Sequence, residues 1–275
     1  MQTLSLTSRA FYNNVLGEYE EFLVKKFKYD KALPMNTGVE AAESAVKLAR
    51  RWAYDVKKVP NNKAKVVFAE NNFWGRSIAA ISSSSDPESY GGFGPFVPLF
   101  ERVPYNDLKA LEKAISDPNT AGFMVEPIQG EAGVVVPDVG YLKVRLLAHY
   151  HDGVRPDIVV LGKALSGGVY PVIDDEGLVE NSAKMGELFM SKLRTLPKDV
   201  VKTVRGRGLF VAIVINEKYD AWMVCNRLLA NGVLSKNTHG DVIRFTPPLC
   251  INKAQIEEVF DIISKTIQQV VAEHK

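Results

Sequence analysis

Residues 65–69 read KVVFA, residues 122–126 read GFMVE and residues 157–161 read DIVVL, and these three short apolar runs decide the fold class. Each run has the length and the side chains of a buried strand. Helical patterns lie between or before them, for example over residues 39–56 and 107–115. Strands that alternate with helices predict an α/β fold with a mainly parallel central sheet and helices on both faces.

Away from these strands, the pattern predicts a further helix at the N-terminus, over residues 5–27, and a loop over residues 86–96. The C-terminal part has a different order, with helices and strands predicted over residues 180–196, 209–215, 221–231, 242–245 and 253–273. This order predicts a smaller α+β domain over residues 178–275, which follows a large domain over residues 1–177.

Composition and charge exclude several classes of protein. The chain has 34 basic and 32 acidic residues and a net charge of +2, so we expect no nucleic-acid partner. No apolar run reaches the ~20 residues of a membrane span, and no targeting segment is visible at the N-terminus. Two cysteines and four scattered histidines, of which His149 and His151 are two apart, predict no metal site.

Lys163 is a candidate for covalent chemistry. It lies in the stretch LGKALSGG, residues 161–168, directly after a predicted buried strand. A lysine amine in an apolar site loses its proton readily and can form a Schiff base with a carbonyl compound. The alternative is a lysine that only caps the end of a strand.

Residues 36–43, NTGVEAAE, open a predicted helix and are a candidate phosphate site. Backbone amides at a helix start bind phosphate, and Gly38 permits a close approach. The alternative is a plain capping box, because Thr37 and Glu40 have the spacing for one.

Three further segments carry candidate binding residues. The segment Phe73-Trp-Gly-Arg76 offers an aromatic ring and a cation that can bind a carboxylate, or it forms a packed aromatic corner. Arg244 is a cation within an apolar strand and needs an anionic partner, from the protein or from a substrate. Residues 126–133, EPIQGEAG, follow a predicted strand at the edge where α/β proteins bind ligands, or they form an ordinary turn.

Taken together and in this order, TGVEAAE, NNFWGR, FMVEPIQGEAGV, RPDIVVLGKALSGG and IRFTPPL resemble the ornithine aminotransferase branch of the class III aminotransferases. The resemblance covers essentially the whole chain. It implies a pyridoxal-phosphate-dependent transferase of fold type I. It also implies transfer of the terminal amine of L-ornithine to 2-oxoglutarate by a ping-pong mechanism, giving glutamate-5-semialdehyde and glutamate. Two alternatives are another ω-aminotransferase, acting on acetylornithine or 4-aminobutyrate, and a catalytically inactive homologue that serves as a binding subunit.

The resemblance also implies roles for single residues in cofactor binding. Lys163 would hold pyridoxal 5'-phosphate covalently and move the proton during the transfer. Gly38 and Val39 would donate backbone amides to the cofactor phosphate. Phe73 would stack on the ring, and Gln129 would lie near its phenolic oxygen.

Substrate binding falls to three other residues in the same resemblance. Arg76 would bind the distal carboxylate of 2-oxoglutarate, and Arg244 would bind the α-carboxylate of 2-oxoglutarate or glutamate. Glu131 would pair with Arg244 while ornithine is bound. The family further implies a homodimer, located in the mitochondrial matrix or the cytoplasm.

Three family segments have no counterpart in the chain. One is N-terminal, one falls within residues 143–147, and one falls between Val172 and Ile173. The second carries the aspartate that would pair with the cofactor's ring nitrogen, and the third carries a threonine for the partner subunit's cofactor phosphate. We interpret the sequence as an intact enzyme given without these segments, rather than a true truncation. We therefore expect gaps longer than a peptide bond at the two internal junctions.

Overall fold

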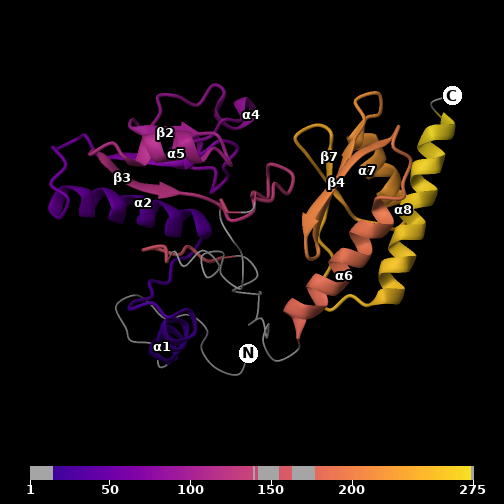
Figure 1. Ribbon diagram of the computed structural model, residues 1–275, viewed down its shortest axis with the longest axis horizontal. Coiled ribbons are helices and arrows are strands. Elements are labelled where there is room, and N and C mark those ends of the chain that lie inside the picture. The colour runs from indigo at the N-terminus through magenta and orange to yellow at the C-terminus, as the bar shows by residue number, and fades with distance from the viewer. Residues whose placement is uncertain (1–14, 139, 142–154, 163–176, 274–275) are drawn as a thin grey trace.

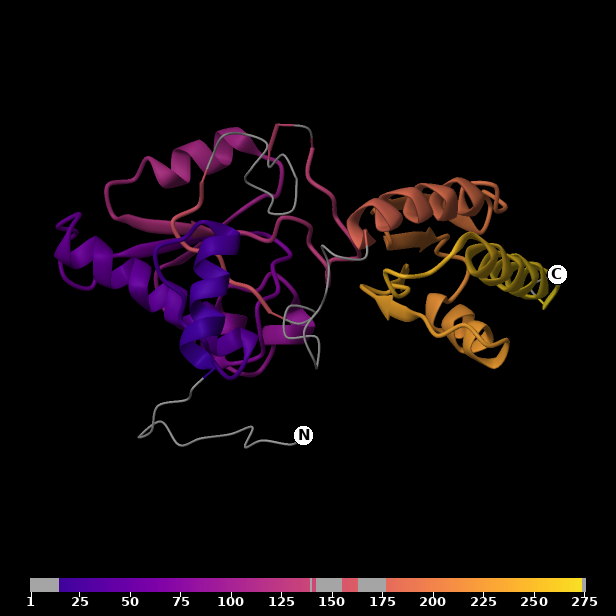
Figure 2. The same cartoon turned by 90° about the horizontal axis from the view of Figure 1, so that it is seen from below.

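The computed structural model describes residues 15–138, 140–141, 155–162 and 177–273. The described residues contain two separate sheets, one in the N-terminal part and one in the C-terminal part, which lie side by side (Figures 1 and 2). No strand is shared between them. The predicted boundary between residues 177 and 178 lies between these parts, and we retain it as a proposal.

The N-terminal sheet is parallel, as the sequence predicts. Its strands are β1 (Lys65–Ala69), β2 (Phe100–Val103) and β3 (Thr120–Met124), in the order β2-β1-β3. The observed β3 begins and ends two residues before the predicted run over 122–126. Because β1 is central, its carboxyl end lies between those of its two neighbours, at the edge where ligands bind in such sheets.

Helices cover both faces of this sheet, again as predicted. Val66 and Phe68 of β1 pack with α2 (Gly38–Asp55). Val67 points the other way and packs near α5 (Leu108–Ile115). Alternate residues of a strand face opposite sides, so one fully buried strand anchors a helix on each face.

The remaining helices of this part are short or lie outside the sheet. They are α1 (Leu16–Phe27), α3 (Ile78–Ser82) and α4 (Pro87–Tyr90). The last of these corrects the prediction of an uninterrupted loop over residues 86–96. Its start has the expected chemistry, since the Asp86 side chain accepts a hydrogen bond from the Glu88 amide and proline occupies the first turn.

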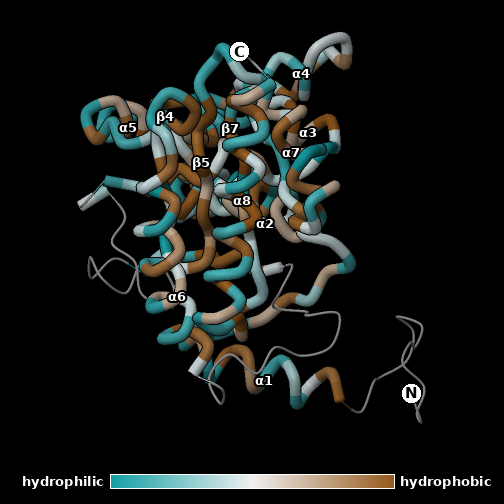
Figure 3. Tube along the Cα trace, turned by 90° about the vertical axis from the view of Figure 1, so that its right-hand side faces the viewer, coloured by the Kyte–Doolittle hydropathy of each residue, from teal (hydrophilic) through white to brown (hydrophobic). Residues whose placement is uncertain are grey.

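The C-terminal sheet is antiparallel and has the order β4-β5-β7-β6. Its strands are β4 (Val201–Arg207), β5 (Phe210–Ile215), β6 (Lys236–Thr238) and β7 (Val242–Phe245), and its helices are α6 (Leu178–Leu193), α7 (Ala221–Ala230) and α8 (Lys253–Glu273). The helices bury one face of the sheet, where Val211, Ile213 and Ile215 of β5 join a large apolar core. Figure 3 shows β5 as hydrophobic along its length.

The opposite face of this sheet is turned toward the N-terminal part. Ala212 of β5 and Val242 of β7 pack there with Val134, which belongs to the segment that follows β3. All three side chains are buried. The two parts of the molecule therefore meet at this segment, and side chains on this face of the C-terminal sheet are placed to reach it.

The prediction of a strand over residues 157–161 is wrong. The structure forms no strand there, and Ile158 and Val160 are 40% and 39% exposed. A strand is stable only beside a partner that takes up its backbone hydrogen bonds, and the three-stranded sheet does not extend to this run. Strands β2, β4 and β6 were not predicted, because each is short or polar in sequence.

Several predictions fall outside the described residues. These are the helix over residues 5–14, Lys163, His149 and His151, and both expected gaps, at 143–147 and at Val172–Ile173. Within the described residues, no helix is long and apolar enough to cross a membrane.

Candidate functional site

The start of α2 forms an open cradle of backbone amides. Half of the capping box is present: Thr37 Oγ1 accepts a hydrogen bond from the Glu40 amide at 3.2 Å, and the Thr37 hydroxyl donates to a Glu40 carboxylate oxygen at 3.1 Å. It leaves the amides of Gly38 and Val39 without an acceptor among the described residues. A side chain at Gly38 would meet nothing within 4 Å. These amides, with the helix dipole behind them, suit a phosphate group.

Residues 73–77 are attached to this cradle. Gly75 lies so close to Val39 that a Cβ at Gly75 would come within 2.3 Å of Val39 Cγ2. Ser77 Oγ also donates a hydrogen bond to Glu43 of α2. Contacts made by residues 73–77 therefore place Phe73 and Arg76 near the start of α2.

The two aromatic residues of this segment have different surroundings. Trp74 packs into the core, stacked on Phe68 at 5.8 Å, and its Nε1 donates to Ser83 Oγ at 2.7 Å. Phe73 is only partly buried, and the exposed Arg76 guanidinium lies 5.6 Å from the centre of its ring. Of the two interpretations of this segment, the packed aromatic corner applies to Trp74. Phe73 and Arg76 remain accessible to a ligand.

Glu126 follows β3 and accepts hydrogen bonds from backbone amides of two segments, one that follows β1 and one that follows β3. One carboxylate oxygen accepts the Phe73 amide at 2.8 Å, and the other accepts the Gly130 amide at 3.3 Å. Its backbone carbonyl accepts the Tyr105 hydroxyl at 3.2 Å. This residue had no predicted role of its own, although it opens the predicted segment EPIQGEAG.

Gln129 is buried at the same edge, with 1% of its surface exposed. Its side-chain amide donates to the Glu70 carbonyl at 2.6 Å, directly after β1. Its backbone exchanges two hydrogen bonds with Val135, each 3.0 Å long. The structure thus places Gln129 at the carboxyl end of the parallel sheet, with one side-chain donor already used.

Residues 130–134 form a tight turn between these anchors. Gly133 has φ +82° and the buried Val134 has φ +58°. A left-handed backbone is rare for a β-branched residue and is retained only where the surroundings fix it. We define residues 129–135 as the bridging segment, because they join the parallel sheet to the face of the C-terminal sheet.

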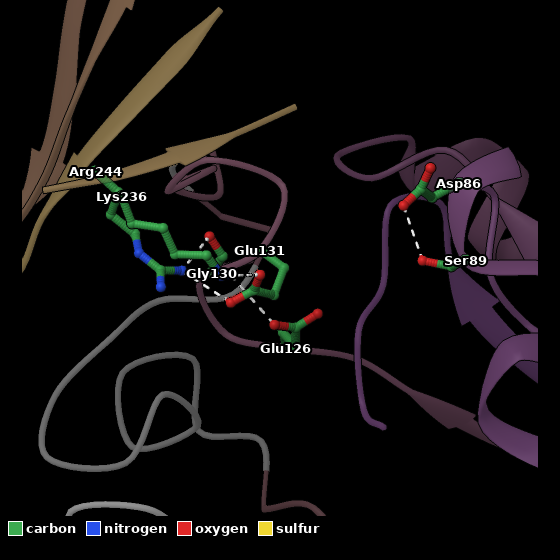
Figure 4. Close-up of polar contacts among 7 residues, drawn as sticks. All are labelled: Asp86, Ser89, Glu126, Gly130, Glu131, Lys236 and Arg244. Atoms are coloured by element: carbon green, nitrogen blue, oxygen red, sulfur yellow. Dashed lines mark hydrogen bonds and ion pairs between the residues drawn. The ribbon is translucent and has the colours of Figure 1, made fainter. Parts of the chain in front are cut away.

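Three cations of the C-terminal sheet reach this segment from one cross-strand row. In the register, Arg205 of β4 faces Ala212 of β5, which faces Arg244 of β7, which faces Lys236 of β6. Arg205 Nε donates to the Gly133 carbonyl at 2.7 Å, and Arg244 donates from Nη1 to the Gly130 carbonyl at 3.1 Å. Figure 4 shows Arg244 and Lys236 extending from their strands toward Glu131.

Glu131 pairs with two of these cations. One carboxylate oxygen lies 3.1 Å from Arg244 Nη1, and the other lies 2.7 Å from Lys236 Nζ. Burial alone would raise the pKa of Glu131, but the hydrogen bonds from Lys236 and Arg244 outweigh it and hold the pKa below its usual value. Glu131 is therefore an ionised carboxylate between two cations at neutral pH.

The structure gathers most of the predicted site residues into two groups. Gly38, Val39, Phe73 and Arg76 lie at the start of α2, and Gln129, Glu131 and Arg244 lie at the bridging segment. Lys163 lies outside the described residues. Glu126, Arg205 and Lys236 were missed. A signal for Lys236 was present, because a turn at His239-Gly240-Asp241 places Lys236 directly opposite Arg244.

The described residues offer no group of histidine, cysteine and carboxylate side chains that could hold a metal ion. They offer instead amide donors for a phosphate, a partly exposed ring and two arginines for carboxylates. This donor set fits a phosphorylated aromatic cofactor together with a substrate that carries carboxylates.

Comparison with known proteins agrees with this chemistry. A family model described as "Aminotransferase class-III" matches residues 1–145 and 169–267. A protein of Caenorhabditis elegans named "Probable ornithine aminotransferase, mitochondrial" is 62% identical over 328 residues, covering 96% of this chain and 78% of the relative. That aligned length exceeds the 275 residues of the chain, so the relative has internal residues with no counterpart here.

Solved structures are similar in fold. The structure of an ornithine aminotransferase from Toxoplasma gondii, described with partial occupancy of pyridoxal phosphate at the active site, has a TM-score of 0.90 and 39% identity. The match covers 98% of this chain and 79% of that one. An acetylornithine aminotransferase from Elizabethkingia anophelis has a TM-score of 0.82 and 38% identity, and the match covers 97% and 82% of the two chains.

Proposed function

We propose, from the premise that the chain belongs to the class-III aminotransferase family, that it transfers the terminal amine of L-ornithine to 2-oxoglutarate. The products would be glutamate-5-semialdehyde and glutamate. The single observation that carries the proposal is the pairing of Glu131 with Arg244 at the bridging segment. It supports a role for Arg244 in carboxylate binding, because Glu131 is a counter-charge that a substrate carboxylate can replace.

The proposed cofactor is pyridoxal 5'-phosphate, which supplies an electron sink at the carbon that exchanges its amino group. Gly38 and Val39 are proposed to bind its phosphate, and Phe73 to stack on its ring. Gln129 is proposed to lie near the ring's phenolic oxygen through the part of its amide not used by Glu70. Lys163 is proposed to hold the cofactor and to carry the proton on Nζ.

The proposed substrate contacts divide between two arginines. Arg76 is exposed and is proposed to bind the distal carboxylate of 2-oxoglutarate. Arg244 is proposed to bind the α-carboxylate, with Glu131 as its partner while ornithine occupies the site. Each contact is a charge-assisted hydrogen bond, and arginine can form two of them to one carboxylate.

Borohydride trapping tests the cofactor assignment. After incubation with pyridoxal phosphate, reduction should add the cofactor to the peptide that contains Lys163, as read by peptide mass spectrometry. A matched Lys163→Met variant should gain no label at that peptide. Labelling of another lysine in the wild type would contradict the assignment.

Substrate choice is tested by comparing amine donors. The similarity to an acetylornithine aminotransferase makes acetylornithine the main competitor of ornithine, and 4-aminobutyrate completes the comparison. We expect the highest kcat/KM for ornithine.

We also expect Arg76→Ala to raise the KM for 2-oxoglutarate more than that for ornithine. Equal effects would indicate that Arg76 is structural.

The intact mass distinguishes an enzyme from an inactive binding homologue. The sequence has a mass of 30.5 kDa, and the resemblance assigns no residue of it to the cofactor's ring nitrogen. If the protein isolated from its organism has a mass well above this value, it contains the absent segments, and the proposed enzyme activity is supported. A mass equal to that of the sequence, without aminotransferase activity, would favour the inactive homologue.

A homodimer is proposed as the working assembly. Leu48 and Trp52 of α2 and its C-cap residue Val56, spaced by four residues, are 58%, 48% and 61% exposed. They form an apolar stripe on the side of α2 away from the sheet, and exposed apolar patches of this kind are typical of interaction sites.

A mitochondrial location is proposed from the name of the Caenorhabditis elegans relative, and cell fractionation tests it.

A further inference from the structure

Glu131 is shared between two cations of the C-terminal sheet. Arg205, Arg244 and Lys236 form one row on the sheet face, and Glu131 is the carboxylate that pairs with the last two. Arg205 bonds to backbone carbonyls, and burial lowers the pKa of its guanidinium without neutralising it. Asp241 interacts electrostatically with Arg205, so the Glu131 carboxylate is shared by Arg244 and Lys236.

Arg244 keeps unused hydrogen-bond donors in this arrangement. Only Nη1 makes hydrogen bonds within the described part of the chain, and it divides them between the Gly130 carbonyl and Glu131, each at 3.1 Å. Its Nε and Nη2 donors have no acceptor there. Arg244 can therefore turn toward a ligand carboxylate, provided that Glu131 is released at a modest energetic cost.

Lys236 has the geometry to lower that cost. Its Nζ lies 2.7 Å from the Glu131 oxygen that Arg244 does not use, which is shorter than the 3.1 Å of the Arg244 contact. The Lys236 side chain is 52% exposed, and a lysine has a long stem with several rotatable bonds, so it can follow the carboxylate. An ionised carboxylate that loses its only cation is destabilised, whereas one that keeps a second cation is not.

We propose that Lys236 is a positioning residue that holds Glu131 when Arg244 changes partner, and that it thereby sets the affinity of the site for dicarboxylates. Lys236 acts through Glu131 and not on the substrate. The inference rests on the proposed function in taking a dicarboxylate as the ligand. It predicts that Lys236 affects the 2-oxoglutarate half of the reaction and leaves the ornithine half, in which Arg244 stays paired, unchanged.

The test is a double-mutant cycle with glutarate, a dicarboxylate that cannot react. Calorimetry on the cofactor-loaded enzyme should show that Lys236→Met weakens glutarate binding about fivefold, the change expected for loss of one exposed ion pair. In the Glu131→Gln background the same substitution should have less than half this effect. Lys236→Arg should restore binding, and kcat/KM for ornithine should not change.

Each other outcome overturns the inference. Equal weakening in both backgrounds would mean that Lys236 attracts the ligand directly. Unchanged glutarate binding in Lys236→Met would mean that Lys236 has no role in the exchange. Wild-type turnover of ornithine and 2-oxoglutarate is measured in parallel. If turnover is normal, such a result removes this inference alone. If turnover is absent, the proposed function fails by a separate measurement.

Discussion

At the scale of single residues, Gly75 determines how residues 73–77 approach the start of α2. Its φ of +152° is unfavourable for other residues, and a Cβ would lie 2.3 Å from Val39 Cγ2. We expect Gly75→Ala to displace Val39 and to lower stability by about 1–3 kcal/mol. Affinity for pyridoxal phosphate, measured by absorbance titration, should fall with it.

Gly17→Ala is a matched control for this prediction. Gly17 lies in α1, where an added Cβ meets nothing within 4 Å, so alanine should stabilise the helix by up to about 1 kcal/mol. If both substitutions leave stability and cofactor affinity unchanged, the contact between Gly75 and Val39 contributes neither to stability nor to cofactor binding.

Because Glu131 ionises, its contribution to the free energy of unfolding should depend on pH. Its pKa is lower in the folded chain than in the unfolded chain, because the bonds from Lys236 and Arg244 outweigh burial. Such a group contributes stability above its unfolded pKa, and the contribution is lost as the pH falls through the folded pKa. We expect Glu131→Gln to be less stable than wild type by about 1 kcal/mol at pH 7. The difference should shrink as the pH falls below the unfolded pKa of about 4.3 and through the lower folded pKa.

Urea unfolding at several pH values measures this difference. Glu258→Gln is the control, since Glu258 is exposed on α8 and should show no difference at either end of the range. A Glu131→Gln difference that persists at low pH would show that the carboxylate's charge is not its source.

At the scale of elements, the bridging segment is fixed to the C-terminal sheet by Val134. This side chain is fully buried against Ala212 and Val242, and its backbone has φ +58°. We expect Val134→Ala to lower stability by about 1–3 kcal/mol and to weaken glutarate binding, because Glu131 lies three residues away on the same turn. Thermal unfolding and calorimetry measure the two effects.

Leu234→Ala is the control for the bridging segment. Leu234 is 83% exposed in the same part of the chain, so its truncation should change neither quantity. Loss of stability without any change in glutarate binding would show that the segment serves folding alone.

At the scale of the whole molecule, the stripe on α2 predicts how copies of the chain associate. The double substitution Leu48→Glu, Trp52→Glu would bury unpaired carboxylates in a dimer interface, which is strongly unfavourable. We expect the wild type to be a dimer and this variant a monomer by size-exclusion chromatography with light scattering. Leu234→Glu places the same charge elsewhere and should leave the dimer intact. A dimer that survives the double substitution would place the interface on another surface.

The sequence alone determined the elements whose signals are local. The apolar run of β1, the pattern of β7 and the capped start of α2 all appear where predicted, because side-chain periodicity and capping act over a few residues. The amide cradle is local in the same sense, since Gly38 and Val39 open one helix. The family motifs imply chemical roles for these positions, and those roles could be predicted before the arrangement of the residues in space was known.

The tertiary structure alone decided which distant residues meet. DIVVL has the composition of a strand, yet it forms none, because a strand also needs a neighbour that local sequence does not supply. Glu131 lies 113 positions from Arg244 and 105 positions from Lys236. Their contact depends on the register of β6 and β7 and on the face that the sheet turns toward the bridging segment. The counter-charges of the site thus follow from the packing of two sheets, which no single stretch of sequence specifies.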